Sequence, residues 1–450
     1  GRRSEGSAVL SCRVLTRHRG TAAGPEWNPD DPPTKMKRRG FFLMNYDKKT
    51  IRDIDVSGKK ILLRCDFNVP HDKTTGIIHD DTRIVSTLPT IRYLLEHNAA
   101  VILLSHMGRP HGQWKKELSL FSARDHLEKL LGIPVPLTQD VLGPDTKEKC
   151  AALQPGQVVL VENLRFRLEE EQNDPDFSRE LASLADLFVF DAFGAAHRAH
   201  ASTEGVSHYL PSVAGLLVEK ELQFMGAALE APKRPLVAIL GGAKVADKIG
   251  VIKNLLQKAD TILIGGGMSY TFLAAQGRPI GTSLLDADHV DYARQMLDQA
   301  SQLGVNLLLP LDNLAAKEFS PDAAPVLVDA QNFPEDLMGM DIGPKTIQLF
   351  TDAIRGAGTV IWNGPMGVFE FPAFAQGTRA VAAAMAQQAD AVTIVGGGDS
   401  ASAVEQTGLA HQLSHISTGG GASLEFLEGL VLPGIACLAD KEQAGGNADS

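Results

Sequence analysis

The sequence predicts an α/β fold in which two successive halves of the chain each form a parallel sheet covered by helices on both faces. Short, near-continuous apolar runs alternate with longer amphipathic stretches, which is typical of buried parallel strands joined by helices. The 450 residues allow two or three domains with large cores. One unbroken helical pattern over residues 214–230 is a natural connector between the halves, although an ordinary crossover helix fits the same pattern.

Composition and charge exclude several classes of protein. The formal net charge of −11 argues against nucleic acid or a membrane surface as partner. No apolar run approaches the ~20 residues that a membrane-spanning helix needs. The cysteines are far apart and form no CxxC pair, which predicts neither a disulfide framework nor a zinc site and fits the reducing cytoplasm. They are Cys12, Cys65, Cys150 and Cys437.

Residues 1–43 differ in composition from the rest of the chain. They carry nine Arg or Lys against four Asp or Glu, a net charge of +5 that leaves −16 for the remainder. Their Pro, Gly and Asp clusters predict a disordered segment. An Arg-rich, acid-poor start is compatible with a transit peptide, but the initial Gly and the well-patterned sequence from Met44 favour a mis-assigned start or a non-native extension. Residues 441–450 are expected to be a loose tail.

The first half, residues 44–213, contains four stretches that begin as buried strands and end in polar residues. Helical patterns such as 82–98 and 120–131 lie between them. In sheets of this kind, ligands bind beyond the carboxyl ends of the strands. The four stretches are KKILLRCDFNVP (59–70), AAVILLSHMGRP (99–110), GQVVLVENLRF (156–166) and ADLFVFDAFGAAHRAH (185–200).

Cationic and polar side chains follow these strands at one topological position. A single arginine is usually a solvated surface residue, but repetition over four βα loops is harder to explain in that way. Because Arg forks match carboxylate and phosphate geometry, the repetition predicts a pocket for a small, multiply anionic molecule. The side chains are those of Asp66, Asn68, Arg83, His106, Arg109, Arg165, His197 and Arg198.

The second half, residues 231–413, repeats the alternation but ends its strands in glycines. Four glycine-rich turns occur within residues 235–248, 260–270, 358–370 and 391–400. One glycine triplet is weak support, but four indicate a site where backbone approaches a ligand closely. A nucleotide is the natural candidate. Lys244 and Lys248, expected on one helix face, would meet its phosphates, and Glu370 would lie near its ribose.

The stretch AVTIVGGGDS at 391–400 is the most informative of these turns. Residues 391–395 read as a buried strand, and Asp399 and Ser400 as N-caps of a helix over 401–406. The free N–H groups of such a turn attract phosphate oxygens. Asp399 is a suitable carboxylate for Mg²⁺. Taken alone, the stretch fits a purely structural turn equally well.

Several familiar site patterns are absent from the sequence. DAFG and HRA resemble the protein-kinase DFG and HRD signatures, but they have the wrong spelling and the reverse order. There is no GxxxxGK[ST] phosphate loop, no GxGxxG dinucleotide turn with its acidic partner, and no GxSxG nucleophile elbow.

Taken together, these motifs resemble the phosphoglycerate kinase family in its compact bacterial form. The resemblance runs in order from about Asn45 to Leu438 through DFN, SHMGRP, ENLRF, DAFGAAHRAH, GGAKVADK, NGPMGVFE, GGGDS and STGGGASLEFLEG. It implies two similar-sized, doubly wound parallel-sheet domains joined by a hinge helix. The N-terminal domain (44–213) would bind 3-phosphoglycerate and the C-terminal domain (231–413) Mg-nucleotide, with residues 414–440 packing back near the first domain.

The resemblance also implies roles for individual residues, carried over by motif position. Catalytic roles fall on Arg83, Lys244, Lys248 and Gly397. Substrate contacts fall on Asp66, Asn68, Arg83, His106, Met107, Gly108, Arg109, Arg165 and Arg198. Nucleotide contacts fall on Lys244, Lys248, Gly339, Glu370, Gly396, Gly397, Gly398, Asp399 and Ser400, with Asp399 also the ligand of Mg²⁺. His197 lies within a family motif but receives no chemical role.

Two departures from the family pattern bear on packing. Phe190 stands where Asn is usual before DAFG, which puts in question the packing near Arg198. The run Asp312 to Ala316 replaces a β-branched apolar strand and is expected to weaken a strand beside the nucleotide pocket. The family pattern has no counterpart to residues 1–43.

The implied activity is reversible phosphoryl transfer between 1,3-bisphosphoglycerate with ADP and 3-phosphoglycerate with ATP, by a monomer without nucleic-acid or membrane partners. A carboxylate or phosphate acceptor is already ionised at neutral pH, so no general base is required. Two other functions stay open from the residues alone: an acyl-phosphate kinase acting on acetate or carbamate, and a non-catalytic nucleotide-gated binder.

Overall fold

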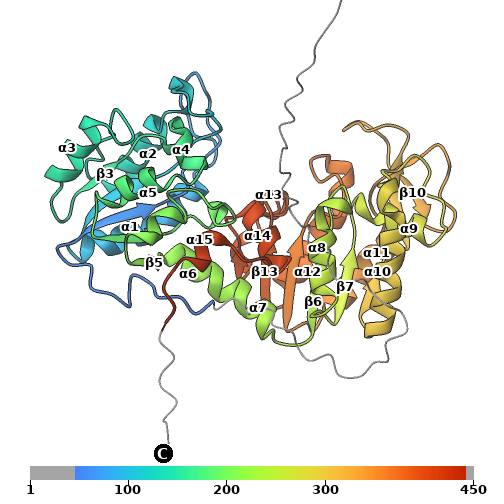
Figure 1. Ribbon diagram of the computed structural model, residues 1–450. Helices are drawn as coiled ribbons and strands as arrows, with labels where there is room; N and C mark the ends of the chain where they lie inside the picture. Colours follow the sequence, from blue (N-terminus) through green and yellow to red (C-terminus); the bar gives the residue numbers. More distant parts are fainter. Residues whose placement is uncertain (1–45, 442–450) are drawn as a thin grey trace, which may run out of the picture. The chain divides into compact units, whose positions relative to one another are not determined.

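The structure of the protein, a computed structural model, describes residues 46–441 (Figure 1). The prediction of a disordered extension at 1–43 lies outside these residues, and so does the loose tail expected at 441–450 apart from Lys441, whose N–H donates to Asp47 O. The described chain contains two parallel sheets with helices around them, in agreement with the α/β fold that the sequence predicts.

The first sheet is built from the four strands that the sequence predicts and one more. Its order is β3-β2-β1-β4-β5, and every neighbouring pair is parallel. The strands are β1 (Lys60–Arg64), β2 (Ala100–Leu104), β3 (Val158–Leu160), β4 (Leu187–Phe190) and β5 (Ser212–Ala214). The helices are α1 (Thr82–Glu96), α2 (Phe121–Leu131), α3 (Pro144–Ala152), α4 (Leu168–Glu171) and α5 (Pro175–Ala182), with 3₁₀ turns at Lys116–Leu118, Leu164–Phe166, Phe193–Ala195 and Gly205–His208.

The connector differs in detail from the single helix expected over 214–230. Ala214 ends β5, and Gly215, whose N–H donates to Phe190 O, separates the strand from the helix. The helix then consists of α6 (Leu216–Glu221), a π-helical segment (Leu222–Gly226) and α7 (Ala227–Glu230). A π segment inside a helix often marks a functional or bending position.

The second sheet has the order β14-β13-β12-β6-β7-β8, and its pairs are all parallel. Its strands are β6 (Leu236–Leu240), β7 (Thr261–Ile264), β8 (Asn306–Leu308), β12 (Thr359–Asn363), β13 (Val392–Gly396) and β14 (His415–Ile416). The helices are α8 (Ile249–Leu255), α9 (Met268–Ala275), α10 (Val290–Leu303), α11 (Pro344–Ile354), α12 (Gln376–Ala386) and α13 (Gly398–Thr407), with 3₁₀ turns at Ala246–Lys248, Ala287–His289, Pro372–Phe374 and Ala410–Gln412.

The unusual run at 312–316 forms a strand, as the resemblance implies, and lies in a small antiparallel sheet that the sequence did not predict. The sheet consists of β9 (Asp312–Ala316) between β10 (Val326–Asp329) and β11 (Met338–Ile342). The buried Asp312 carboxylate accepts hydrogen bonds from the N–H of Lys345 and Thr346 at the start of α11, at 3.0 and 2.8 Å. The polar residue therefore anchors a helix N-terminus in addition to pairing in a strand.

The last part of the chain contacts the first sheet as well as the second. After β14 it forms α14 (Gly420–Leu427) and α15 (Pro433–Ala436). Gly434 N–H donates to Ala196 O, and Ala439 N–H to Ser212 O, each at 2.9 Å. Phe190, the departure noted in the sequence, is fully buried against Gly434, where an added Cβ would lie 2.9 Å from its ring.

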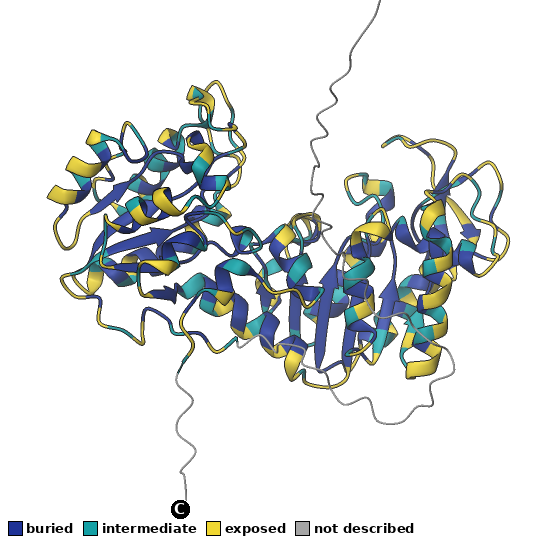
Figure 2. Ribbon diagram, in the orientation of Figure 1, coloured by how far each residue is buried: buried dark blue, intermediate teal, exposed yellow. Residues whose placement is uncertain are grey.

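Most strand residues of the two parallel sheets are buried (Figure 2), apart from the edge strand β8. Along β1, Leu62 packs into one hydrophobic cluster while Ile61 and Leu63 pack into another. Along β6, Ala238 and the next residue, Ile239, likewise pack into two different hydrophobic clusters. Alternate residues thus fill cores on opposite faces, as the near-continuous apolar strands predicted.

Two further expectations concern cysteines and membranes. Within residues 46–441, Cys65, Cys150 and Cys437 are free thiols, and Cys12 lies outside the described residues. None of the helices in this part of the chain has both the length and the apolar character needed to cross a membrane.

Candidate active site

The carboxyl ends of β1, β2 and β3 and the loop after β4 surround a cavity of about 300 Å³, called here the cationic pocket. The four βα loops singled out in the sequence do converge on it. Its lining residues are Asp66, Asn68, Arg83, His106, Gly108, Arg109, Arg165, Gly194, Ala195, His197, Arg198, Gly420 and Gly421.

Arg83 is held at the edge of the pocket by the loop that follows β1. Its Nη1 donates to Asn68 O at 2.9 Å and lies 3.3 Å from the Asp66 carboxylate. The Asp66 side chain is largely buried, whereas 35% of the Arg83 side chain remains exposed. Arg83 is thus oriented by charge-assisted contacts while part of its guanidinium stays accessible to a ligand.

The loop after β2 is fixed around Gly108, which has a φ of +60°. Its N–H donates to Asn68 Oδ1 at 2.9 Å, and its carbonyl accepts from Arg165 Nη1 at 2.7 Å. An added Cβ would lie 2.7 Å from Leu118, so glycine is favoured by both conformation and space. One glycine therefore joins residues from three loops at the edge of the sheet.

Burial and mutual proximity shift the pKa values of the cationic groups. Burial, followed by the neighbouring Arg64, lowers the pKa of Arg165 to about 10. Burial and the surrounding arginines, of which Arg165 acts most strongly, lower the pKa of His200 to about 3. The pKa of His197 is lowered by burial and by Arg198. Such crowding of like charge is unfavourable in an empty site and is relieved by a bound anion.

The lining of the cationic pocket differs from the predicted substrate contacts: one predicted residue is missing from it and several further residues belong to it. The Met107 side chain is buried in the core and does not line the pocket, and its backbone bonds to the Asn163 side chain. Lining residues that were not predicted are Gly194, Ala195, Gly420 and Gly421, whereas His197 was expected at this edge without a chemical role. The four unpredicted residues lie inside quoted motifs, but single glycines and alanines carry no chemical signal of their own.

The four glycine-rich turns follow β6, β7, β12 and β13, which are neighbours in the second sheet. They border a more apolar cavity of about 500 Å³, called here the glycine-rich pocket. Its lining residues are Gly242, Ala243, Gly266, Gly267, Tyr270, Thr282, Leu284, Phe319, Met338, Gly339, Met340, Pro365, Met366, Gly367, Val368, Phe369, Glu370 and Asp399. The turns pack tightly, since a Cβ on Gly241 would lie 2.1 Å from Pro365 O. Of the predicted nucleotide contacts, Gly339, Glu370 and Asp399 line this pocket.

The expectation that Lys244 and Lys248 share a helix face is wrong. The 3₁₀ turn begins only at Ala246 and α8 at Ile249, because Gly242, with a φ of +95°, and the buried Val245 hold the preceding segment as a loop. Lys244 is exposed and lies outside the lining of the glycine-rich pocket.

Lys248 is buried and its Nζ donates to Asn363 Oδ1. Burial lowers its pKa to about 8, while the nearby carboxylates Asp247 and Asp399 act in the opposite direction. A desolvated ammonium that titrates near neutrality binds an anion strongly while it keeps its proton.

The turn after β13 has the predicted strand and glycines but a different helix start. α13 begins at Gly398 with Gly397, at a φ of +93°, as the N-cap, so Asp399 and Ser400 are not caps. Ser400 Oγ instead accepts a hydrogen bond from Gly364 N–H at 2.6 Å and ties two glycine turns together. Asp399 is left exposed at the first turn of the helix, beside the pocket.

The donor chemistry around Asp399 fits Mg²⁺ brought with a nucleotide. Within residues 46–441, no group of three or more His, Cys, Asp or Glu side chains is arranged to hold a metal ion. Mg²⁺ commonly binds through one or two carboxylates together with substrate phosphates and water. A single accessible carboxylate at a helix N-terminus is compatible with that mode.

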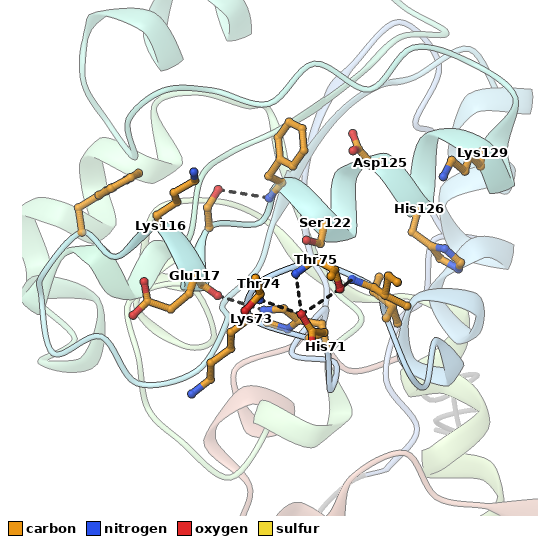
Figure 3. Close-up of a pocket in the computed structure, with 17 residues that line it drawn as sticks. His71, Lys73, Thr74, Thr75, Lys116, Glu117, Ser122, Asp125, His126 and Lys129 are labelled. Atoms are coloured by element: carbon orange, nitrogen blue, oxygen red, sulfur yellow. Dashed lines mark hydrogen bonds between the residues drawn. The ribbon is translucent and has the colours of Figure 1, made fainter.

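A larger cavity, of about 890 Å³, lies elsewhere, beside the 71–78 segment and α2 (Figure 3). None of the predicted site residues lines it. Figure 3 shows Lys73 and Lys116 on one side of it and Lys129 on the other. Its cations are spread apart and mixed with Asp72 and Glu117, so the smaller cationic pocket is the better anion site.

Comparisons with known proteins identify the family of the chain. The sequence profile of the family described as phosphoglycerate kinase matches residues 51–430. Phosphoglycerate kinases of Clostridium botulinum and Clostridium novyi are 58% and 57% identical over 401 residues, which is 88% of this chain and 100% of each relative.

Solved structures give the same result. Phosphoglycerate kinase from Coxiella burnetii has a TM-score of 0.81 at 43% identity, over 87% of this chain and 98% of that one. The enzyme from Pyrococcus horikoshii has a TM-score of 0.75 at 32% identity, over 86% and 98%. With a family match over most of its length and relatives more than half identical, the chain belongs to the phosphoglycerate kinase family, and is a kinase.

Proposed function

We propose that this enzyme transfers a phosphoryl group reversibly between 1,3-bisphosphoglycerate and ADP, giving 3-phosphoglycerate and ATP, with Mg²⁺, in glycolysis and gluconeogenesis. The acceptor in the reverse direction is a carboxyl group. The observation that carries the proposal is the convergence of Arg83, Arg109, Arg165 and Arg198 with His106 on one cavity. A molecule with both a phosphate and a carboxylate suits such a site.

The two cavities divide the recognition between them. The cationic pocket would take 3-phosphoglycerate through the residues predicted above, with Met107 acting only by fixing the loop through its backbone bonds to Asn163. The glycine-rich pocket would take the nucleotide, with its base against the apolar side chains of Leu284, Phe319 and Met338 and its ribose near Glu370. Its phosphates would reach Lys248 and the turn from Gly396 to Ser400, whose free N–H groups favour anions.

Catalysis would rest on positioning and charge rather than on a general base. The attacking carboxylate is ionised at neutral pH, so the protein needs only to align it with the γ-phosphate and neutralise the equatorial oxygens. That neutralisation falls to Arg83, to Lys248 and to the Gly397 N–H, with Lys244 reaching the site only if its loop moves. Mg²⁺ held by Asp399 would supply further positive charge at the nucleotide phosphates.

Because the two cavities belong to different sheets, we infer that the domains close about the connector to bring the reacting oxygens to about 3–3.5 Å. The π-helical segment over Leu222–Gly226 would be the position of this bend. Closure would also exclude water, which otherwise hydrolyses an acyl phosphate. We further propose that the enzyme acts as a cytoplasmic monomer.

The test of the proposal is an ATP-consumption assay with candidate acids. We expect turnover with 3-phosphoglycerate and Mg²⁺, and background rates with acetate or carbamate, because those acids have no second anionic group for the arginines. Faster turnover with acetate would favour the rival acyl-phosphate kinase. Nucleotide binding without turnover on any acid would favour a non-catalytic binder.

The lowered pKa of Lys248 gives a prediction for nucleotide binding. The ammonium form attracts phosphate, so affinity for ADP should fall as the pH rises through about 8 and the proton is lost, by at most about tenfold per pH unit. Lys248→Met, which removes the charge, should bind ADP more weakly at pH 7 and show no such fall. Calorimetric titration across this range measures both, and an equal fall in the two proteins would remove Lys248 from the phosphate site.

A further inference from the structure

A chain of buried polar groups runs behind the cationic pocket and ends on His106. It links Glu170 on α4, Ser202 in the loop after β4, Arg64 at the end of β1 and His106 after β2. The Ser202 hydroxyl donates to Glu170 Oε1 at 2.5 Å and accepts from Arg64 Nε at 2.8 Å. Arg64 Nη2 lies 3.1 Å from His106 Nδ1. Four elements are thereby joined.

Arg64 is not itself part of the pocket lining. Its side chain is 1% exposed, and its Nη1 donates to Cys65 O. The fully buried Glu170 carboxylate offsets its charge through Ser202. A buried guanidinium costs free energy to desolvate, so a sheet strand would more readily end in an apolar residue if packing were the only requirement.

The contact between Arg64 and His106 determines where the imidazole carries its proton. A guanidinium has only N–H donors, so the nitrogen facing it must act as acceptor. Nδ1 therefore has no proton, and a neutral ring must carry its proton on Nε2. The competing arrangement, Nδ1–H donating to Asp66, is not made, because that carboxylate oxygen is 4.0 Å away.

The charges around His106 keep the ring neutral. Burial is the main cause that lowers its pKa well below the usual value. The positive charges of the nearby arginines act in the same direction; they are Arg64, Arg165, Arg83 and Arg198. An imidazolium would need a proton on Nδ1 as well, directly against the Arg64 guanidinium. The ring thus faces the pocket as a neutral group with one fixed donor.

We propose that Arg64 is a positioning residue that holds His106 as the neutral Nε2–H tautomer, so that the imidazole offers one fixed hydrogen-bond donor to the anionic substrate beside the arginines of the pocket. The proposal rests on the proposed function, in which His106 contacts 3-phosphoglycerate. In this arrangement His106 is a donor throughout and takes no part as a base.

The tautomer can be measured directly in the full-length protein without substrate. Long-range ¹H–¹⁵N correlation spectra of ¹⁵N-histidine-labelled enzyme distinguish Nδ1–H, Nε2–H and doubly protonated rings, and His106→Gln assigns the signal. We expect an Nε2–H pattern for His106 that persists on acidification until the protein unfolds. An Nδ1–H or doubly protonated ring at neutral pH would overturn the proposal, whatever the catalytic activity.

A double variant tests the role of Arg64 in function. Arg64→Met combined with Glu170→Gln removes both buried charges together and so limits the risk of misfolding. We expect the KM for 3-phosphoglycerate to rise about 10-fold to 100-fold, as for one hydrogen bond to a charged group. The KM for ATP should not change and kcat should change little, since the interaction is lost equally from the ground state and the transition state. The Nδ1 resonance of His106 should shift as its donor disappears.

The control is Arg92→Met, which removes an exposed arginine of α1 that donates to Leu130 O. It should leave both KM values and the His106 spectrum as in the parent. If the Arg64 variant folds and phosphorylates 3-phosphoglycerate with unchanged KM, the positioning role is wrong while the proposed function stands. If the parent enzyme does not act on 3-phosphoglycerate at all, the proposed function fails and the tautomer result stands separately.

Discussion

Replacing Arg83 by Ala is expected to lower kcat for phosphoryl transfer to 3-phosphoglycerate by about 10²-fold or more. Arg83 is fixed by Asn68 and Asp66 on one side while part of its guanidinium remains exposed at the pocket. A donor held in this way needs little reorganisation when charge develops on the transferred group. The effect of Arg83→Ala on nucleotide affinity should be far smaller, because Arg83 does not line the glycine-rich pocket.

Steady-state kinetics and ADP titration of Arg83→Ala measure the two quantities separately. Arg92→Ala is the matched control, since it removes an exposed arginine of the same helix and should retain the parental kcat. Arg83→Lys should recover only part of the rate because an ammonium cannot reproduce a planar fork. A parental kcat in Arg83→Ala would exclude Arg83 from catalysis.

Replacing Asp399 by Ala is expected to weaken Mg-nucleotide binding by about 10-fold to 100-fold, in the range seen when a metal site loses a partner. The loss should be much smaller for nucleotide in EDTA, because only the metal-dependent part of the affinity involves this carboxylate. Calorimetry with and without Mg²⁺ measures the difference.

Glu405→Ala is a suitable control for Asp399→Ala. Glu405 is an exposed acidic residue farther along α13 and lies outside the glycine-rich pocket. The Glu405→Ala variant removes the same charge from the same helix as Asp399→Ala, so a general electrostatic effect would appear in both variants. Equal losses in the two, or native Mg-nucleotide affinity in Asp399→Ala, would contradict the metal assignment.

The sequence predicted the parallel sheets well because their strands carry a strong local signal. The runs that became β1, β2, β6 and β13 are apolar and β-branched, and each ends in glycine or polar residues. Since parallel strands share one carboxyl edge, the order of residues along the chain was sufficient to expect arginines and glycines to gather there. Both pockets lie at such an edge.

Features that depend on tertiary packing were not predicted. The small antiparallel sheet includes Asp312, whose polar side chain argues locally against a strand but serves α11. Ser400 reads as a helix cap, yet its hydroxyl accepts a hydrogen bond from the Gly364 N–H in the turn after β12. The Arg64 contact with His106 joins residues far apart in the sequence, and no spacing rule indicates it.

The sequence also gave no basis for the apolar part of the glycine-rich pocket. Phe319 and Leu284 are exposed hydrophobic residues in separate loops. Single exposed apolar residues are common on protein surfaces and carry no functional meaning alone. Their relevance follows only from their common position around one cavity.

The central claim is that arginines at the edge of the first sheet bind the small acid while backbone turns of the second bind the phosphoryl donor. A crystal structure of the enzyme with 3-phosphoglycerate and a non-hydrolysable ATP analogue tests it most directly. We predict electron density for the acid among Arg83, Arg109, Arg165 and Arg198, and for the triphosphate at the Gly396 to Ser400 turn. Density for the acid anywhere else, with those four guanidinium groups contacting no ligand, would contradict the account.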